Sequence, residues 1–505
     1  MKKITLIYPY ADFDKNSDTI QIPYGLFCLG SYLDYKGYKV KILDTRINIK
    51  SGDNINKQII KETKDADIVG FSVLTANIEN AIKMSDLIKE NSKTRIIWGG
   101  IHPSLFPEQT CKDKSIDYVC RGEGEEVMDE LLKGLPLKKI KGLVYKNKEK
   151  IIINEERKPI KLEEQPPLNW NLIKLNAYIK SQGFSHGVEK AIYLQASRGC
   201  PYRCTFCVNR ILKCYNNWRP KKIETLMNEI KYVTDKYNLS WIKFVDENFF
   251  VNKKRAIEIS KRIIKEGYNF KWNANIRANY FDKKFLTDKD LKIAVKSGLK
   301  EVDMGAESGS NKILNKLKKD ITRKQLINSA KRCNQFNIVP IYSFMIGIPD
   351  ETEKDMMDTV SVMKDISDQC PEAVFLGPHI YRPYPGGELY EEVKKLGFKE
   401  PENLREWPEV VKESENKALA VGDRTGYTTY DQLTWVKNPK LVKNIVMYSA
   451  YAAQNPLVLM KRKKFLTAGF ALISKARFKT NFWAMPYEHR LATKLLNVIH
   501  KGTKK

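Results

Sequence analysis

Three cysteines within eight residues are the part of this sequence most able to do chemistry. They are Cys200, Cys204 and Cys207, and they follow an apolar run, 191–196, that is typical of a β-strand. A Cys-x3-Cys-x2-Cys loop that folds back on itself brings three thiolates together, and thiolates are the ligands that hold iron–sulfur clusters. Three ligands leave one iron of a four-iron cube without a protein ligand. A small molecule can coordinate that iron and receive an electron there.

Two other interpretations of these cysteines stay open. A structural zinc site takes four Cys or His ligands, and Cys214, seven residues after Cys207, is the nearest further candidate. As a fourth ligand, Cys214 would instead close the cluster and leave a plain electron carrier. Disulfides are not expected, because the nine cysteines show no paired framework and the N-terminal run Met1–Tyr10 is typical of a strand, not of a signal peptide. We therefore expect a reducing, cytoplasmic location.

The cysteine spacing, with Phe206 just before the last cysteine, resembles that of the radical S-adenosylmethionine (SAM) superfamily. The resemblance implies a 4Fe-4S cluster whose free iron chelates the amino and carboxylate groups of SAM. Reduction of such a cluster splits SAM into methionine and a 5′-deoxyadenosyl radical, which removes hydrogen from carbon positions that no side-chain base deprotonates. It also implies anaerobic chemistry and an electron donor of the flavodoxin or ferredoxin type.

Residues 1–150 alternate strand-like apolar runs with helical patterns, which predicts an α/β, flavodoxin-like (Rossmann-like) parallel sheet with helices on both faces. Ligands of such sheets bind beyond the carboxyl ends of the strands. The predicted strands are 4–8, 39–43, 68–72, 95–98 and 118–120. The candidate ligand-binding residues at their ends are Ser72, Thr75, Gly99, Gly100, Gly122 and Glu123.

Directly ahead of a radical SAM loop, this module resembles the cobalamin-binding domain of B12-dependent radical SAM enzymes. The resemblance is carried by the stretch Asp67–Ser72 and by the turns Gly99–Pro103 and Gly122–Glu125. The Asp-x-His-x-x-Gly loop that supplies a cobalt-ligating histidine in other B12 proteins is absent after the first strand, and a turn position near the corrin edge is favoured for His102, the sole histidine of the module. The resemblance implies base-off, His-off cobalamin. A response-regulator-like or purely structural flavodoxin-like domain stays open as an alternative.

A linker and a second α/β module follow. Residues 151–185 break into charge and paired prolines, and the segment around Trp170 resembles the family's connector that packs between the two modules. Residues 186–390 contain six strand-like runs, which fit the superfamily's open partial (β/α)6 barrel with its chemistry at the carboxyl ends of the strands. These runs are 191–196, 241–245, 271–276, 301–304, 339–346 and 373–380.

Polar residues at these strand ends are candidates for binding SAM. Asp246, Glu247 and the amide carbonyl of Asn248 suit its ammonium group, and Arg277 suits its carboxylate. Glu307 and Ser308 lie in a turn that resembles the family's SAM-binding turn, where they would contact ribose hydroxyls or the methionine moiety. For each single residue a helix cap or a locally satisfied turn is the alternative. Further candidates are the turn 347–352 for adenine and Arg382 and Tyr384 for the substrate.

The charge of the chain is strongly basic. There are 88 Lys plus Arg and 60 Asp plus Glu, a net charge of +28, spread along the whole chain without a nucleic-acid motif. A solvated lysine-rich surface is the plain interpretation, followed by an anionic membrane face or an anionic substrate; specific nucleic-acid binding is not expected.

Residues 391–505 are predicted to be mostly helical, with a basic cluster Lys461–Lys464 ahead of the apolar run Phe465–Ser474. This run is too short to span a bilayer. It either docks on the barrel or, with Phe482, Trp483 and Tyr487 nearby, lies on the inner face of an anionic membrane.

The combined pattern predicts a cobalamin-dependent radical SAM methyltransferase. By the resemblance, it would methylate an unactivated carbon or phosphorus centre through a 5′-deoxyadenosyl radical and methylcobalamin. Ring formation or rearrangement with the same cofactors stays open, because the barrel supplies the radical in both cases. A non-catalytic basic protein with a structural metal is the distant alternative. The expected substrate is a small or lipid-like molecule.

Overall fold

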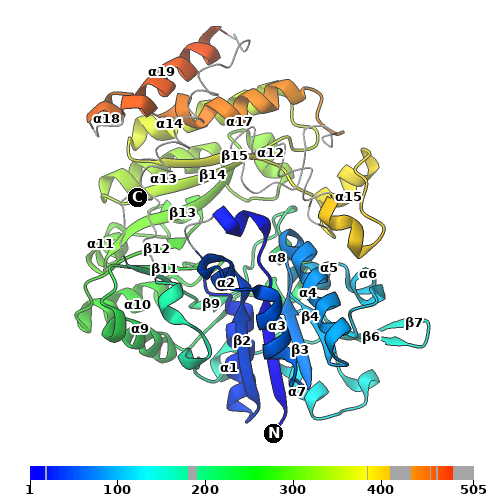
Figure 1. Ribbon diagram of the computed structural model, residues 1–505. Helices are drawn as coiled ribbons and strands as arrows, with labels where there is room; N and C mark the ends of the chain where they lie inside the picture. Colours follow the sequence, from blue (N-terminus) through cyan, green and yellow to red (C-terminus); the bar gives the residue numbers. More distant parts are fainter. Residues whose placement is uncertain are drawn as a thin grey trace.

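The computed structural model describes residues 1–16, 20–179, 190–383, 385–409, 434–454, 456–461 and 465–480. Two α/β units lie side by side, and helices of the C-terminal region cover one end of the second unit (Figure 1). The predicted class is confirmed: an N-terminal Rossmann-like unit, a partial barrel and a helical C-terminal region follow one another along the chain.

The N-terminal unit is a seven-stranded sheet in the order β2-β1-β3-β4-β5-β6-β7, parallel from β1 to β5. Strand order reverses between β1 and β3, and this switch point is where sheets of this kind bind ligands. The strands are β1 (Lys3–Tyr8), β2 (Lys39–Asp44), β3 (Ile68–Ser72), β4 (Arg95–Gly99), β5 (Tyr118–Cys120), β6 (Leu143–Asn147) and β7 (Lys150–Ile153). The helices are α1 (Tyr24–Tyr35), α2 (Thr45–Ser51), α3 (Ile55–Thr63), α4 (Ile78–Asn91), α5 (Ile101–Leu105), α6 (Pro107–Lys112) and α7 (Glu125–Leu132).

The hairpin of β6 and β7 was not predicted from the sequence. It pairs antiparallel with β5, and β7 ends at Ile153, inside the segment expected to be linker. Its turn carries no glycine; Lys148 itself takes the positive φ of 54° that Asn-Gly or Asp-Gly turns usually supply. The turn therefore left no signal of the usual kind.

The second unit is a six-stranded parallel sheet in the order β15-β14-β13-β12-β11-β8, with no pairing between the two outer strands. It is the open barrel that the sequence predicts. Capping boxes at Thr287, Thr322 and Thr352 start three of its helices. The strands are β8 (Ala191–Leu194), β11 (Trp241–Phe244), β12 (Lys271–Asn275), β13 (Leu299–Glu307), β14 (Val339–Ile346) and β15 (Val374–Ile380). The helices are α9 (Ile223–Tyr237), α10 (Lys253–Lys265), α11 (Asp288–Lys296), α12 (Asn311–Lys316), α13 (Arg323–Gln335) and α14 (Glu353–Gln369).

The two units share one apolar core through the linker. Trp170 meets Phe27 of α1 edge-on at 5.0 Å between ring centroids and stacks on Tyr232 of α9 at 5.6 Å. In addition, the hydroxyl of Tyr24 donates to the carbonyl of Tyr193 on β8 at 2.8 Å. The connector around Trp170 thus packs between the modules, as predicted.

The C-terminal helices are α15 (Glu388–Lys395), α17 (Pro439–Ala453), α18 (Pro456–Lys461) and α19 (Phe465–Thr480). Helix α17 lies on β15 and α14, and α19 lies on α17. The indole of Trp435 anchors this layer by donating to the carbonyl of Gly347 at 2.7 Å. Among the described residues no helix is long and apolar enough to cross a membrane. Trp483 and Tyr384 lie outside the described residues.

A segment after α15 reaches back to the N-terminal unit. The ring of Trp407 lies 4.9 Å from that of Phe106 and 5.1 Å from that of His102, and its indole donates to Gln109 at 2.8 Å. Beside it, Arg405 pairs with Asp86 and Asp113. This segment holds the outer side of α5 and α6.

Trp407→Ala is expected to lower the free energy of unfolding by about 3 kcal/mol, because it empties a buried aromatic site between two parts of the chain. Arg405→Ala should cost less than about 1 kcal/mol, since the arginine side chain is 39% exposed and water screens its ion pairs. Urea denaturation of the two variants measures the contrast. Equal losses would show that the ion pairs hold this segment as strongly as the aromatic contact does.

Candidate functional site

The three cysteines lie in the loop that leaves β8 at the carboxyl end of the barrel. Burial raises the pKa of Cys200 and raises that of Cys207 to about 11, and the charge of Cys204 raises both further. Each thiol is therefore within electrostatic reach of another. Among the described residues no three Cys, His, Asp or Glu side chains converge closely enough to hold a single metal ion, whereas a four-iron cube takes each thiolate on a different iron.

The backbone of the loop is closed by glycine and by a short strand pair. Gly199 has φ of 84°, and a Cβ there would lie 2.2 Å from the carbonyl oxygen of Asn217, so only glycine fits. The amide of Cys200 donates to the carbonyl of Tyr215 at 2.9 Å. On either side, β9 (Ser197–Arg198) pairs antiparallel with β10 (Arg219–Pro220). The chain thus returns on itself around the cysteines.

Cys214 does not lie with the other three cysteines. Its sulfur lies 3.6 Å from where a Cβ of Gly122 would be, in the interface with the N-terminal unit. Burial raises its pKa to about 12, and the main charges acting on it are those of Glu123 and Arg219. The residues present fit a three-thiolate cluster with an open iron better than a four-ligand zinc site.

Two cationic side chains, Arg277 and Lys319, lie near the cysteines. The guanidinium of Arg277 stacks on the ring of Tyr202, 3.6 Å from its centroid, and donates to the carbonyl of Lys319. Both Arg277 and Lys319 lower the pKa of Cys200. Sequence reasoning selected Arg277 but missed Lys319, one of 88 basic residues with no motif to single it out.

Lys319 pairs with a predicted SAM-binding residue. Its ammonium donates to Glu307 at 2.7 Å, and both side chains are buried. Burial alone would lower the pKa of Lys319, but the charges of Glu307 and Cys204 outweigh burial and raise this pKa. The lysine therefore stays charged beside the cluster, where it can meet a carboxylate of a ligand as well as that of Glu307.

The two carboxylates predicted to bind the SAM ammonium, Asp246 and Glu247, make different contacts in the structure. Asp246 is buried and accepts from the amide of Ala196 and the hydroxyl of Ser197, so it holds the end of β8. Glu247 accepts from the amide of Gly199 at 3.0 Å and holds the cysteine loop.

The neighbouring Asn248 has a buried amide oxygen without a hydrogen-bond partner. A buried acceptor left open in this way fits an ammonium ligand, so Asn248 stays a candidate SAM-binding residue.

The remaining barrel candidates are satisfied locally or lie further out. Ser308 is buried, its hydroxyl lies 3.1 Å from that of Thr359, and it accepts from the amide of Ser310. In the turn 347–352, Glu351 accepts from two backbone amides while its other oxygen has no partner, and burial raises its pKa to about 8. Arg382 lies half-buried just beyond β15.

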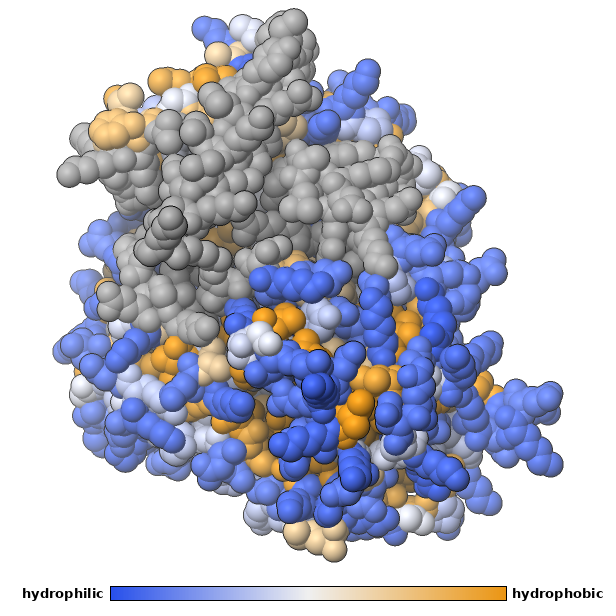
Figure 2. Space-filling view, viewed as in Figure 1, coloured by the Kyte–Doolittle hydropathy of each residue, from blue (hydrophilic) through white to orange (hydrophobic). Residues whose placement is uncertain are grey.

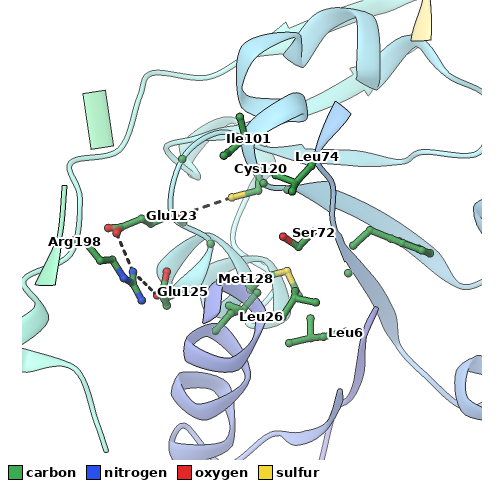
Figure 3. A pocket seen from close by; sticks show the side chains of 18 of the residues that line it. Leu6, Leu26, Ser72, Leu74, Ile101, Cys120, Glu123, Glu125, Met128 and Arg198 are labelled. Atoms are coloured by element: carbon green, nitrogen blue, oxygen red, sulfur yellow. Dashed lines mark hydrogen bonds and ion pairs between the residues drawn. The ribbon is translucent and has the colours of Figure 1, made fainter. Parts of the chain in front are cut away.

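A cavity of about 280 Å³ opens at the carboxyl ends of β1, β3, β4 and β5 (Figure 3). Gly100 has φ of 101°, and a Cβ there would lie 2.8 Å from the backbone of Val73, so this turn requires glycine. A Cβ on Gly25 of α1 would meet only Ser72, at 4.0 Å, so small residues keep the space open. Of the residues predicted in the N-terminal unit, those lining the cavity are Ser72, Gly99, Gly100, Gly122 and Glu123.

Thr75 and His102 contact each other outside the cavity lining. The hydroxyl of Thr75 lies 3.2 Å from Nδ1 of His102, and the imidazole packs between Phe106 and Trp407. Burial lowers the pKa of His102 to about 3, so the ring stays neutral. Neither residue lines the cavity, which fits cobalamin bound without this histidine as a ligand.

The far wall of the cavity comes from the barrel. Gln195, Arg198, Tyr215 and Glu247 complete the lining opposite Leu26 and Met128 of the N-terminal unit. One apolar wall, one polar wall and a glycine-lined floor suit part of a corrinoid, which has an apolar ring face and polar side groups. The cavity is thus shared by the unit that suits cobalamin and by the loop that carries the cysteines.

A buried ion-pair network joins these two parts. Arg198, two residues before Cys200, donates to Glu123 at 2.9 Å and to Glu125 at 3.1 Å (Figure 3). Arg219 donates to both oxygens of Glu123, at 2.9 and 3.0 Å. The carboxylate of Glu123, predicted to contact the cofactor, therefore binds two arginines of the barrel while it lines the cavity. Neither arginine was predicted, because a pairing across units leaves no local pattern.

The comparisons with known proteins agree with this geometry. The models that match are the B12 binding domain, over residues 15–132, and the radical SAM superfamily, over residues 194–363. An uncharacterized methyltransferase of Pyrococcus horikoshii, PH0819, is 34% identical over 398 residues, which cover 77% of this chain and 82% of that protein. An anaerobic magnesium-protoporphyrin IX monomethyl ester cyclase of Rubrivivax gelatinosus is 24% identical over 376 residues, 72% of this chain and 65% of that protein.

Two solved structures share the fold. The cobalamin-dependent S-adenosylmethionine radical enzyme OxsB, with aqua-cobalamin and SAM bound, has a TM-score of 0.68 at 18% identity. The match covers 99% of this chain and 75% of the OxsB chain. The radical SAM methyltransferase TsrM of Kitasatospora setae, with cobalamin and a 4Fe-4S cluster bound, has a TM-score of 0.65 at 16% identity and covers 79% of each chain.

Fold and site together define a radical SAM enzyme with a cobalamin-binding domain, whose cofactors are a 4Fe-4S cluster, SAM and cobalamin. The chain belongs to the family of B12-binding radical SAM proteins.

Alanine at any of Cys200, Cys204 or Cys207 is expected to abolish the brown cluster absorbance of anaerobically purified protein, because two thiolates do not hold the cube. Cys214→Ala, the matched control, should keep the full iron and sulfide content. Iron and sulfide assays with absorbance spectra measure both. Loss of iron in Cys214→Ala would place this residue among the ligands.

Arg198→Lys is expected to weaken cobalamin binding about tenfold at unchanged iron content. Nη1 of Arg198 donates to both buried carboxylates while Nε donates to Gln195 at 3.2 Å, and a single ammonium does not reproduce these contacts of a planar guanidinium. Titration of cobalamin by absorbance and iron analysis measure the two quantities. Arg203→Lys is the control, since Arg203 belongs to the same loop but pairs at the surface with Asp320. Equal cobalamin affinity in both variants would contradict this role.

Proposed function

We propose that this enzyme transfers a methyl group from SAM to an unactivated carbon or phosphorus centre of a small-molecule substrate. One observation carries the proposal: the cysteine loop and the cobalamin cavity share a wall, since Glu247 contacts the loop and lines the cavity. A methyl carrier and a radical source placed side by side suit a reaction that needs both. The name of the 34% identical relative supports the same outcome.

When bound, the cluster and cobalamin supply, respectively, the electron that cleaves SAM and a carrier for its methyl group. The chain's own residues bind these cofactors and orient them. Lys319 and Arg277 present positive charge for the SAM carboxylate, and Asn248 and Glu247 present acceptors for its ammonium group. We retain Glu307 and Ser308 as candidates for the turn beside the ribose. The glycine-lined cavity excludes water from the corrinoid face that it covers.

A second outcome, ring formation or rearrangement without net methylation, is favoured by one observation. The cyclase of Rubrivivax gelatinosus aligns over 72% of this chain and so shares both modules. The described residues of the site serve either outcome, because both need a radical next to cobalamin.

We further propose a flavodoxin- or ferredoxin-type protein as the electron donor, and a cytoplasmic location. The net charge of +28 supports an acidic donor, since opposite charge steers association. The substrate is proposed to be a small molecule; a lipid-like one agrees with the basic and apolar character of the C-terminal helices.

Anaerobic incubation with trideuteromethyl-labelled SAM, a strong reductant and a metabolite extract from a deletion strain tests the activity. Methyl transfer predicts a labelled product together with equal amounts of 5′-deoxyadenosine and S-adenosylhomocysteine. Cyclisation predicts 5′-deoxyadenosine alone and an unlabelled product. Mass spectrometry counts all three. Absence of 5′-deoxyadenosine from protein with full iron content would refute radical chemistry altogether.

A further inference from the structure

One side of helix α19 exposes apolar side chains where a surface helix normally exposes polar ones. Phe465, Leu472 and Ile473 are 65%, 52% and 41% exposed, while Ala468 and Ala471 are buried against the body. Residues 472 and 473 lie about two turns after residue 465, and residue 476 lies about three turns after it. The four residues therefore share one side of the helix. The helix therefore exposes three large apolar residues, while its Phe470 and Phe478 are half-buried.

This apolar face is attached firmly to the barrel. Helix α19 packs on α17, which lies on β15 and α14, and Met460 of α18 adds a further side chain that is 41% exposed. Figure 2 shows hydrophobic atoms gathered along the upper left edge of the molecule, over α18 and α19. The face lies at the end of the molecule away from the N-terminal sheet (Figure 1).

The sequence around this face is almost free of acidic residues. Residues 434–505 contain fifteen Lys or Arg and one acidic residue, Glu488. One seventh of the chain thus carries a net charge of +14, half of the total of +28. Lys475 and Lys479 belong to α19 itself, and the four basic residues 461–464 precede it.

We propose that α18 and α19 form a docking face for an anionic lipid surface. Phe465, Leu472 and Ile473 enter the boundary between headgroups and acyl chains, and the surrounding lysines meet the lipid phosphates. A second copy of the chain is a poorer occupant of this face, because it would bring two strongly basic segments together. The helices lie on the membrane and do not cross it. The proposal goes beyond methyl transfer and does not depend on it.

Flotation of the purified holoenzyme with vesicles tests the proposal. Vesicles of phosphatidylcholine containing about one third phosphatidylglycerol should bind the protein, and phosphatidylcholine alone should not. Serine at Phe465, Leu472 and Ile473 together should weaken binding about 100-fold, because three apolar side chains no longer enter the lipid. Raising the salt to about 0.5 M should also weaken binding.

The matched control is Ile153→Ser on β7, where an isoleucine that is 44% exposed lies on a different part of the molecule. It should bind anionic vesicles as the parent protein does. Formation of 5′-deoxyadenosine in solution should be equal in all these variants, so a failure of the docking face is distinguishable from a failure of the enzyme.

Two results would overturn the proposal. The parent protein could fail to float with anionic vesicles, or the triple serine variant could float as well as the parent. If the triple variant instead converts a dimer to a monomer in gel filtration without changing flotation, the face is an interface between copies of this chain and the lipid proposal is wrong.

Discussion

The structure depends on the buried carboxylate of Glu123 and the two arginines that hold it. Glu123 lies in the turn after β5, Arg198 lies two residues before the first cluster cysteine, and Arg219 lies on the strand that closes the cysteine loop. The amide of Ile160 in the linker donates to the same carboxylate at 2.9 Å. A buried charge removed from its partners is destabilising by several kcal/mol. The relative position of the two units is thereby tied to three separate segments of the chain.

This network also joins the cysteine loop to the linker between the two units. Neighbouring Glu125 accepts from Arg198 and from Gln165 of the linker. Burial raises the pKa of Glu125, whereas the charges of Arg198 and Arg219 outweigh burial and lower that of Glu123. These two buried carboxylates thus differ in how readily they ionise, and Glu123, whose pKa is lowered, contacts both arginines. These contacts connect the turn after β5 directly to the cysteine loop.

What the sequence predicted, and what it did not, follows from how far apart in the chain the partners are. The cysteine loop, the strand-end glycines and the alternation of strands and helices are local patterns, and they predicted both units and the cavity wall. Lys319 and Glu307 are 12 residues apart and Arg198 and Glu123 are 75 apart, so these pairings form only when the sheets are assembled. Asp246 illustrates the reverse case: a strand-end carboxylate suggested ligand contact, but the end of β8 holds both of its oxygens.

Glu307 shows how the site is kept in place at a cost in backbone energy. It has φ of 61°, a conformation that costs a residue with a side chain on the order of 1 kcal/mol. The ammonium of Lys319 and the absence of a side chain at Gly305 accommodate it: a Cβ on Gly305 would lie 2.3 Å from the Glu307 carboxylate. The charge of Cys204 also acts on Lys319, the partner of this carboxylate. The Glu307–Lys319 pair therefore connects the end of β13 to the cysteine loop. The strain is offset by the buried ion pair, because a glycine at position 307 would remove the strain but would leave the Lys319 ammonium buried without its carboxylate.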